Sequence, residues 1–195
     1  PPDMARLVEI AKPTAIFMGP AHAAAFRNTD LLSSHDFSSV KYSVFSGAHC
    51  PPDNLDWWRE QTGSGLCQLW GMTELAAGSF SRPGNDHVAL HSAGPSSPGN
   101  ELRIISSENG ELQDAGKEGE LQIRGSSVFP GYVDNPEANS SAFDKDGWFR
   151  TGDLAVIDAN GNLTITGRIK DIINPSGVKY NPSEIEEIIV TTSTM

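Results

Sequence analysis

Two stretches in the last third of the chain decide its fold: Trp148-Phe149-Arg150-Thr151-Gly152-Asp153 and Ile165-Thr166-Gly167-Arg168-Ile169-Lys170-Asp171. Residues 154–157 and 163–166 have the apolar and β-branched composition of strands. The dipeptide Asn160-Gly161 joins them and is typical of a two-residue primed turn. A loop symmetric about this dipeptide puts Asp153 directly opposite Arg168 on one face of an antiparallel hairpin. The pair taken alone has two interpretations, an ordinary ion pair or part of a ligand site, and the flanking residues favour the second.

Those flanking residues resemble consecutive signatures of the adenylate-forming superfamily, which includes acyl- and aryl-CoA synthetases, nonribosomal peptide adenylation domains and beetle luciferases. Upstream, Trp70-Gly71-Met72-Thr73-Glu74 resembles the adenine and phosphate motif of that family, and Ser46-Gly47-Ala48 resembles its adenine-edge loop. The other matching segments are Gly119-Glu120-Leu121-Gln122-Ile123-Arg124-Gly125, Phe129-Pro130-Gly131-Tyr132, Gly147 to Asp153, Gly167 to Asp171, and Pro182-Ser183-Glu184-Ile185-Glu186. The motifs follow the order and spacing of the family along nearly the whole chain.

The pattern of apolar residues predicts an α/β region followed by an antiparallel β region. Helix and strand patterns alternate over residues 1–83, which favours a parallel sheet with crossover helices. The expected elements there are strands at 15–18, 42–45 and 66–70 and a helix at 53–61. A Ser-, Pro- and Gly-rich linker is expected at 82–99, and strands at 102–105 and 120–124 precede the hairpin.

The resemblance implies three parts. Residues 1–83 are expected to be half of a parallel-sheet α/β subdomain, and residues 84–168 a small distorted β-barrel subdomain. Residues 169–195 are expected to hold a hinge and the start of an α+β lid. A helix of that lid is predicted to begin with Asn181 as its N-cap and Pro182 as its first residue.

Composition excludes several classes of function. The 195 residues carry a net charge of −11 and a pI near 4.7, so no basic footprint for nucleic acid or anionic lipid is present. No apolar run approaches the ~20 residues that a membrane span needs. Cys50 and Cys67 have no metal-ligand or redox spacing, and two unpatterned thiols suit a reducing compartment. We therefore expect a cytoplasmic protein without a membrane span.

The ends of two predicted strands carry candidate ligand-binding residues. Ligands of open parallel sheets bind beyond the carboxyl ends of strands, and here those ends lead into Gly47-Ala48 and Trp70-Gly71. Gly47 allows close approach of the backbone, and the ring of Trp70 offers a face for adenine, with one ring face expected to be open; the alternative is a core aromatic residue. The resemblance implies that the Thr73 hydroxyl binds the α-phosphate and that Glu74 helps to hold Mg²⁺, a cation that prefers oxygen ligands. The alternative for Glu74 is a cap of the following segment.

The resemblance also assigns roles to residues of the hairpin and the strand ends. Asp153 would accept hydrogen bonds from both ribose hydroxyls, and Arg168 would reach the ribose and phosphates, for which a guanidinium is well suited. Lys170 aligns with the hinge about which the lid swings, although an ordinary solvent-facing lysine is the alternative. The expected edge of the acyl pocket consists of Leu69, Gly71, Ala76 and Ala77.

The implied parent enzyme is an AMP-forming acid–thiol ligase that uses ATP, Mg²⁺ and coenzyme A to convert a small carboxylic acid into its thioester. Met72 and the run 170–173 favour coenzyme A as acceptor, whereas a nonribosomal-peptide-type adenylation domain that loads a carrier protein is the first alternative. A truncated, non-catalytic nucleotide-binding module is the second. Residues 173–177 depart from the glycine-rich family turn, which puts the thioester step in doubt.

Two family elements are not found in the sequence. No phosphate loop occurs within residues 1–46, and the catalytic lysine that the family carries in its lid is expected well beyond Met195. We therefore expect the chain to be part of a larger enzyme and, alone, not to form acyl-adenylate at a useful rate. Pyrophosphate release over a panel of carboxylic acids checks this expectation.

Overall fold

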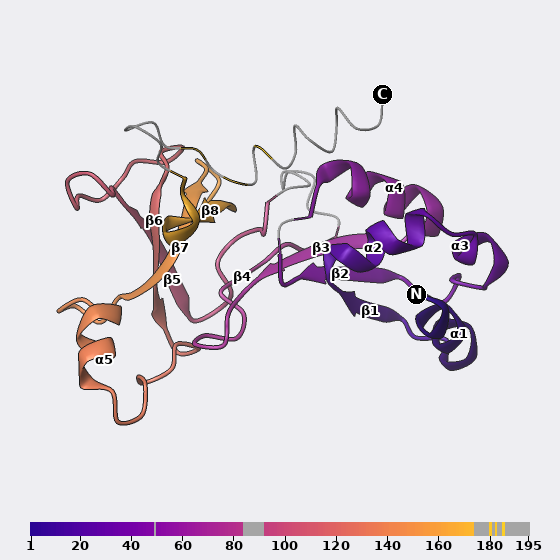
Figure 1. Cartoon of the computed structure of the whole chain (residues 1–195), viewed down its shortest axis with the longest axis horizontal. Coiled ribbons are helices and arrows are strands. Elements are labelled where there is room, and N and C mark those ends of the chain that lie inside the picture. The colour runs from indigo at the N-terminus through magenta and orange to yellow at the C-terminus, as the bar shows by residue number, and fades with distance from the viewer. Residues whose placement is uncertain (49, 84–91, 174–179, 181, 183–184, 186–195) are drawn as a thin grey trace. The chain divides into compact units, whose positions relative to one another are not determined.

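The chain forms two compact units, each with its own sheet (Figure 1). A computed structural model describes residues 1–48, 50–83, 92–173, 180, 182 and 185. The first unit consists of Pro1–Met72 and Ser79–Gly94, and the second of Thr73–Gly78 and Pro95–Met195. The short segment Thr73–Gly78 thus belongs with the later part of the chain. The three-part division at residues 83 and 168 remains a prediction.

The first unit is a mixed four-stranded sheet with helices. Its elements are α1 (Pro2–Ala11), β1 (Ala15–Met18), α2 (Pro20–Arg27), α3 (Leu31–Ser34), β2 (Tyr42–Ser46), α4 (Pro52–Thr62), β3 (Gly65–Trp70) and β4 (Ser79–Phe80). The strand order is β1-β2-β3-β4, in which the first three strands are parallel and β4 is antiparallel to β3. The three predicted strands and the predicted helix are confirmed, each within a residue or so of its expected ends.

The core of the first unit is built around Trp58 on α4, which is fully buried. Its ring meets the rings of Phe26 on α2 and Phe45 on β2 edge to face, with centroids 5.4 Å and 6.2 Å away. The indole Nε1 donates to Ser43 Oγ at 3.0 Å, so the polar end of the tryptophan is satisfied inside the core. This cluster attaches the helices to one face of the parallel strands.

The predicted linker is in part packed structure. Residues 84–91 lie outside the described part, but Ser92 and Ala93 are buried. The hydroxyl of Ser79 bonds to the carbonyl oxygens of Ala93 and Gly94, both at 2.8 Å. Gly94 has φ +81°, and a Cβ there would lie 2.5 Å from the Cα of Ser81. Within the linker expected at 82–99, these residues are therefore part of the packed first unit, because β4 packs against them.

The second unit is an antiparallel sheet in the order β5-β6-β7-β8. Its elements are β5 (Asn100–Ile105), β6 (Gly119–Gly125), α5 (Pro136–Ala142), β7 (Phe149–Ile157), β8 (Leu163–Arg168) and a 3₁₀ turn, η1 (Ile169–Asp171). The predicted strands are confirmed. Within the described ranges no pairing joins β5 to β8, so the sheet is open there and the expected barrel is not closed. The helix predicted from Asn181 falls outside the described residues.

The β7–β8 hairpin ends in a different turn from the one predicted. Gly161 has φ +83°, but Asn160 is not among the described residues with positive φ, so a two-residue type I′ turn is ruled out. The backbone N–H of Gly161 donates to the carbonyl of Asp158, and Asp158 pairs with Asn162 across a three-residue loop. The Asp158 carboxylate accepts the N–H groups of Asn160 and Asn162, both at 2.8 Å. This side chain selects the longer loop.

The longer loop shifts the register by one residue, and a bulge restores it. Next to the loop, Ala155 pairs with Ile165, whereas the predicted register would pair it with Thr166. The register shifts again between Leu154 and Ala155, so that Asp153 does lie opposite Arg168. The predicted pairing is confirmed, although it results from two deviations that cancel.

Among the described residues, no helix combines the length and apolarity needed to cross a bilayer.

Candidate nucleotide-binding site

A large bulge in β7 sets the position of Asp153. Glu120 pairs with Leu154 and Gln122 pairs with Arg150, so one residue of β6 lies opposite residues 151–153 of β7. Bulges of this kind bend a strand and redirect the side chains that follow. Asp153 is the last residue of the bulge, and its side chain is turned into the protein, with only 3 % of the residue exposed.

Thr151 holds this bulge in place. Its hydroxyl donates to the carbonyl of Leu121 on β6 at 2.7 Å and accepts the backbone N–H of Asp153 at 3.1 Å. A side chain thus replaces ladder hydrogen bonds that the bulge interrupts. Gly152 between them has φ +72°, a conformation that costs other residues about 1–2 kcal/mol. Residues 151–153 therefore act together to hold the bulge, a role for Thr151 that the sequence pattern does not predict.

Asp153 and Arg168 form an ion pair across the hairpin, with Arg168 Nε 3.0 Å from Asp153 Oδ1. The two partners differ in exposure, because the carboxylate is buried while 49 % of the arginine side chain faces solvent. The half-exposed guanidinium can bind an anion, whereas the carboxylate can accept ligand hydroxyls only after the atoms that cover it have moved.

Thr73 and Glu74 belong to the same unit as this hairpin. Thr73 is exposed, and Glu74 is half-buried. Glu74 Oε1 accepts the phenol hydroxyl of Tyr132 at 3.0 Å, and the carbonyl of Glu74 accepts the N–H of Phe129 at 2.7 Å. In the part of the chain that the structure describes, no group of three or more His, Cys, Asp or Glu residues gathers around a possible metal ion. Glu74 alone can serve as the protein ligand of Mg²⁺ only if substrate phosphates and water supply the remaining oxygen ligands.

The predicted adenine-edge residues lie at the carboxyl ends of β2 and β3 in the first unit. Ser46 pairs with Leu69 in the parallel register, so Gly47 and Gly71 leave the sheet at the same edge. Gly47 has φ +93° and is exposed, as is Ala48. The sequence placed these two loops together correctly.

Trp70 differs from expectation, because only 9 % of it is exposed. The prediction of an open ring face is therefore wrong for this structure, and a base could stack on the ring only after the atoms that cover it had moved. The prediction rested on a local pattern, a strand end before a glycine. Such a pattern does not show whether other segments of the chain cover the Trp70 ring.

The four predicted acyl-pocket residues are divided between the units. Leu69 and Gly71 are half-buried in the first unit, and Ala76 and Ala77 belong to the second. Ala76 is exposed and has φ +55°, a left-handed conformation that is unusual for a residue with a Cβ. Their assignment to an acyl pocket remains a prediction.

Lys170 is exposed within η1, directly after Arg168 and Ile169. This position is compatible with a hinge, which remains a prediction. Of the unusual turn at 173–177, only Ile173 is among the described residues.

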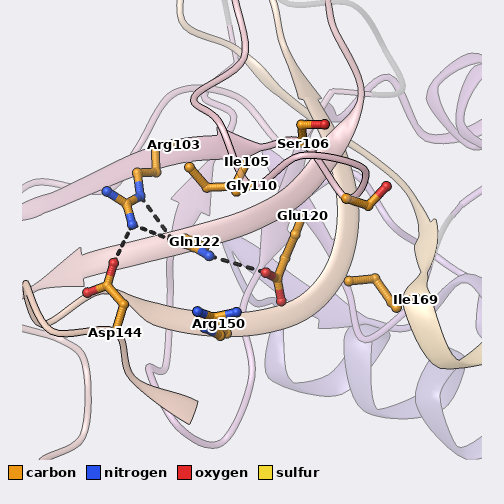
Figure 2. A pocket seen from close by; sticks show the side chains of 10 residues that line it. Arg103, Ile105, Ser106, Gly110, Glu120, Gln122, Asp144, Arg150 and Ile169 are labelled. Atoms are coloured by element: carbon orange, nitrogen blue, oxygen red, sulfur yellow. Dashed lines mark hydrogen bonds and ion pairs between the residues drawn. The ribbon is translucent and has the colours of Figure 1, made fainter. Parts of the chain in front are cut away.

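An open pocket of about 440 Å³ lies over the sheet of the second unit (Figure 2). Arg103, Gln122 and Arg150 stand in one row across β5, β6 and β7. Arg103 donates twice to Gln122 Oε1, at 3.0 and 2.6 Å, and pairs with Asp144 at 2.5 Å. The pocket contains none of the residues predicted as a site, and its polar groups largely satisfy one another.

Asp144 also organises the loop that precedes β7. One carboxylate oxygen accepts the N–H groups of Asp146 and Trp148, both at 2.9 Å. Partial burial opposes ionisation, but these hydrogen bonds and that from Arg103 outweigh it and hold the pKa of Asp144 below its ordinary value. The Trp148 ring in turn packs under the guanidinium groups of Arg103 and Arg124, 4.2 Å and 4.7 Å from its centroid.

Comparisons with known proteins agree with the fold and the motifs. A profile of the AMP-binding enzyme family matches residues 1–133. The nonribosomal peptide synthetase atqA of Aspergillus terreus is 44 % identical over 123 residues, which cover 60 % of this chain and 13 % of the synthetase. Oxalate–CoA ligase of Arabidopsis thaliana is 34 % identical over 163 residues, which cover 80 % of this chain and 30 % of the ligase.

A solved structure extends the likeness to nearly the whole chain. ATP-bound MatB from Rhodopseudomonas palustris matches with a TM-score of 0.85 and 29 % identity, over 96 % of this chain and 37 % of that one. The chain belongs to the AMP-binding enzyme family, within the adenylate-forming superfamily, as its motifs indicated. It spans 13 % to 37 % of the length of these three proteins.

Proposed function

We propose that this chain supplies the ribose- and phosphate-binding part of an enzyme that activates a carboxylic acid with ATP and passes the acyl group to a thiol. In the first step, a carboxylate oxygen bonds to the α-phosphorus as the bond to pyrophosphate breaks, which gives an acyl-adenylate. In the second, the thiol sulfur bonds to the acyl carbon and AMP leaves, while the thiol proton passes to solvent.

The observation that carries the proposal is the pair of Asp153 and Arg168, which would bind the ribose. Asp153 is a buried carboxylate held by a bulge, and it would accept two hydrogen bonds from a diol once the atoms that cover it had moved. Arg168 beside it would bind the anionic side of the nucleotide. Positioning of this kind lowers the barrier because the reacting groups are held in line.

The phosphate end rests on Thr73 and Glu74. The exposed Thr73 hydroxyl would donate to an α-phosphate oxygen, and Glu74 would hold Mg²⁺ together with phosphate oxygens. The cation would neutralise phosphate charge and so reduce the repulsion that an attacking carboxylate meets. Gly47, Ala48 and Gly71 would edge the adenine, and Trp70 would contribute if its ring were uncovered.

Binding of AMP to the chain tests the proposal. We expect calorimetry to detect AMP binding that Asp153→Asn weakens by tenfold or more, because the neutral amide accepts less strongly from two hydroxyls. Asp146→Asn is the matched control, since Asp146 is an exposed carboxylate of the same unit. Equal AMP affinity of wild type and Asp153→Asn would leave only the ion pair and refute the ribose role.

For the acceptor thiol, we favour coenzyme A, supported by Met72 and by the run 170–173. The second candidate, a carrier-protein-loading adenylation domain, is supported by the higher identity to the peptide synthetase over the shorter matched region. Acid-dependent ATP–pyrophosphate exchange with plain acids and with amino acids, measured on the longer polypeptide that contains this chain, separates the two.

A further inference from the structure

The loop that carries Tyr132 is held by a side chain of helix α5. Asn139 Oδ1 accepts the backbone N–H of Tyr132 at 2.7 Å, and Asn139 Nδ2 donates to the carbonyl of Tyr132 at 2.9 Å. The helix itself begins at a capped end, because Asn135 Oδ1 accepts the N–H of Ala138 at 3.1 Å. Both backbone polar groups of Tyr132 are thus fixed by one amide.

The residue before the tyrosine must be glycine for this clamp to form. Gly131 has φ +139°, and a Cβ there would lie 2.9 Å from Asn139 Oδ1, the atom that accepts the Tyr132 N–H. On the other side, the rings of Phe129 and Tyr132 meet edge to face with centroids 4.8 Å apart. Phe129 also meets the buried ring of Phe149 on β7 at 5.5 Å. The phenol ring of Tyr132 is therefore anchored to the sheet.

Two hydrogen bonds join this anchored loop to Glu74. The N–H of Phe129 donates to the Glu74 carbonyl at 2.7 Å, which fixes the backbone, and the Tyr132 hydroxyl donates to Oε1 at 3.0 Å, which fixes the side chain. Oε2 has no hydrogen-bond partner in the described ranges of the chain. A long, flexible carboxylate is held by one oxygen while the other remains available.

The protonation of the phenol agrees with this geometry. Burial, together with the hydrogen bond to Glu74 and its negative charge, raises the pKa of Tyr132. The raised pKa keeps the phenol protonated, and therefore a donor, at neutral pH.

We propose that Tyr132 is a positioning residue for Glu74, holding one carboxylate oxygen so that the other meets the cation and phosphates of a bound nucleotide. The inference rests on the proposed function, because it takes Glu74 as the cation ligand. Partners that orient a metal ligand typically contribute 10–100-fold to metal affinity. Tyr132 would act through Glu74 and would not touch the ligand.

The hydrogen bond itself is tested without any nucleotide. The absorbance of tyrosinate at 295 nm is followed against pH for the chain, and the difference between wild type and Tyr132→Phe isolates this phenol. We expect Glu74→Gln to lower the pKa of that phenol, because the charged acceptor is removed. Tyr42→Phe serves as control for the loss of one phenol, and circular dichroism at each pH checks the fold. An unchanged titration in Glu74→Gln would overturn the proposal.

The positioning is tested by binding of Mn²⁺, a paramagnetic substitute for Mg²⁺, with a non-hydrolysable ATP analogue. We expect Tyr132→Phe to weaken Mn²⁺ binding by about 10-fold to 100-fold and to leave binding of the metal-free analogue unchanged. In the Glu74→Gln background, Tyr132→Phe should have no further effect, since its partner is gone. Equal weakening in both backgrounds, or weaker binding of the metal-free analogue, would overturn a role that works through Glu74.

The two hypotheses fail differently in this experiment. Absence of nucleotide binding by the wild-type chain would refute the proposed function and the cation role with it. Binding of Mn²⁺ and nucleotide by wild type that Tyr132→Phe leaves unchanged would refute the positioning alone.

Discussion

Replacing Thr151 by valine should uncouple the bulge of β7 from the rest of the sheet. Valine has nearly the shape of threonine, so packing is kept while the hydroxyl is lost. Two buried backbone groups then lose their partner, namely the carbonyl of Leu121 and the N–H of Asp153. Thr151 is 9 % exposed, so water can replace the hydroxyl only if the bulge opens.

The expected magnitude follows from these two bonds. An unsatisfied buried polar group costs about 1–3 kcal/mol, and the added methyl recovers part of this, so we expect Thr151→Val to reduce the free energy of unfolding by about 2–4 kcal/mol. With a urea dependence of about 2 kcal/mol per molar, the middle of the usual range, the unfolding midpoint should fall by about 1–2 M. Thr151→Ser keeps the hydroxyl and should lose less than about 1 kcal/mol.

Urea unfolding, combined with hydrogen exchange over residues 149–157, measures this effect. The matched control is Thr164→Val on β8, a half-buried threonine whose hydroxyl has no hydrogen-bond partner in the described residues. The backbone N–H of Asp153 should exchange faster in Thr151→Val alone, and AMP affinity should fall with it. If Thr151→Val and Thr164→Val agree within about 0.5 kcal/mol, the hydroxyl does not hold the bulge.

Three further outcomes are expected. Hydrogen bonds lower the folded-state pKa of Asp144, so its ionised form stabilises the fold above the unfolded pKa of about 3.9. This contribution is lost as the pH falls below that value and through the folded-state pKa, so Asp144→Asn should flatten the acid limb of the stability–pH curve. Burial raises the pKa of Cys50 to about 12 and also raises that of Cys67, so both thiols should resist a disulfide reagent at pH 8 until urea opens the first unit; rapid labelling of the native chain would contradict their burial. Trp58→Phe should reduce the free energy of unfolding by about 2–4 kcal/mol through a lost hydrogen bond and a cavity, whereas Trp57→Phe on the same helix should change it by less than about 1 kcal/mol, and equal effects would count against the core described above.

The sequence by itself predicted the features that depend on neighbours along the chain. Strand periodicity placed every strand except β4, and a helical pattern placed α4, because alternation and capping act within a few residues. Helices α2, α3 and α5 were not predicted. The pairing of Asp153 with Arg168, and the shared sheet edge after Ser46 and Leu69, followed from the same local patterns. The motifs identified the family, which the comparisons confirm.

Tertiary structure decided what depends on residues far apart in the chain. The Asp158 side chain selected a longer loop, and a bulge then restored the register at the open end of the hairpin. Trp70 is buried, although its strand-end position suggested an open ring, because exposure depends on every segment that packs nearby. The bond from Tyr132 to Glu74 joins residues 58 apart, and no local pattern predicts such a contact. Local propensity sets where elements begin and end, whereas packing between distant segments sets which side chains they bring together.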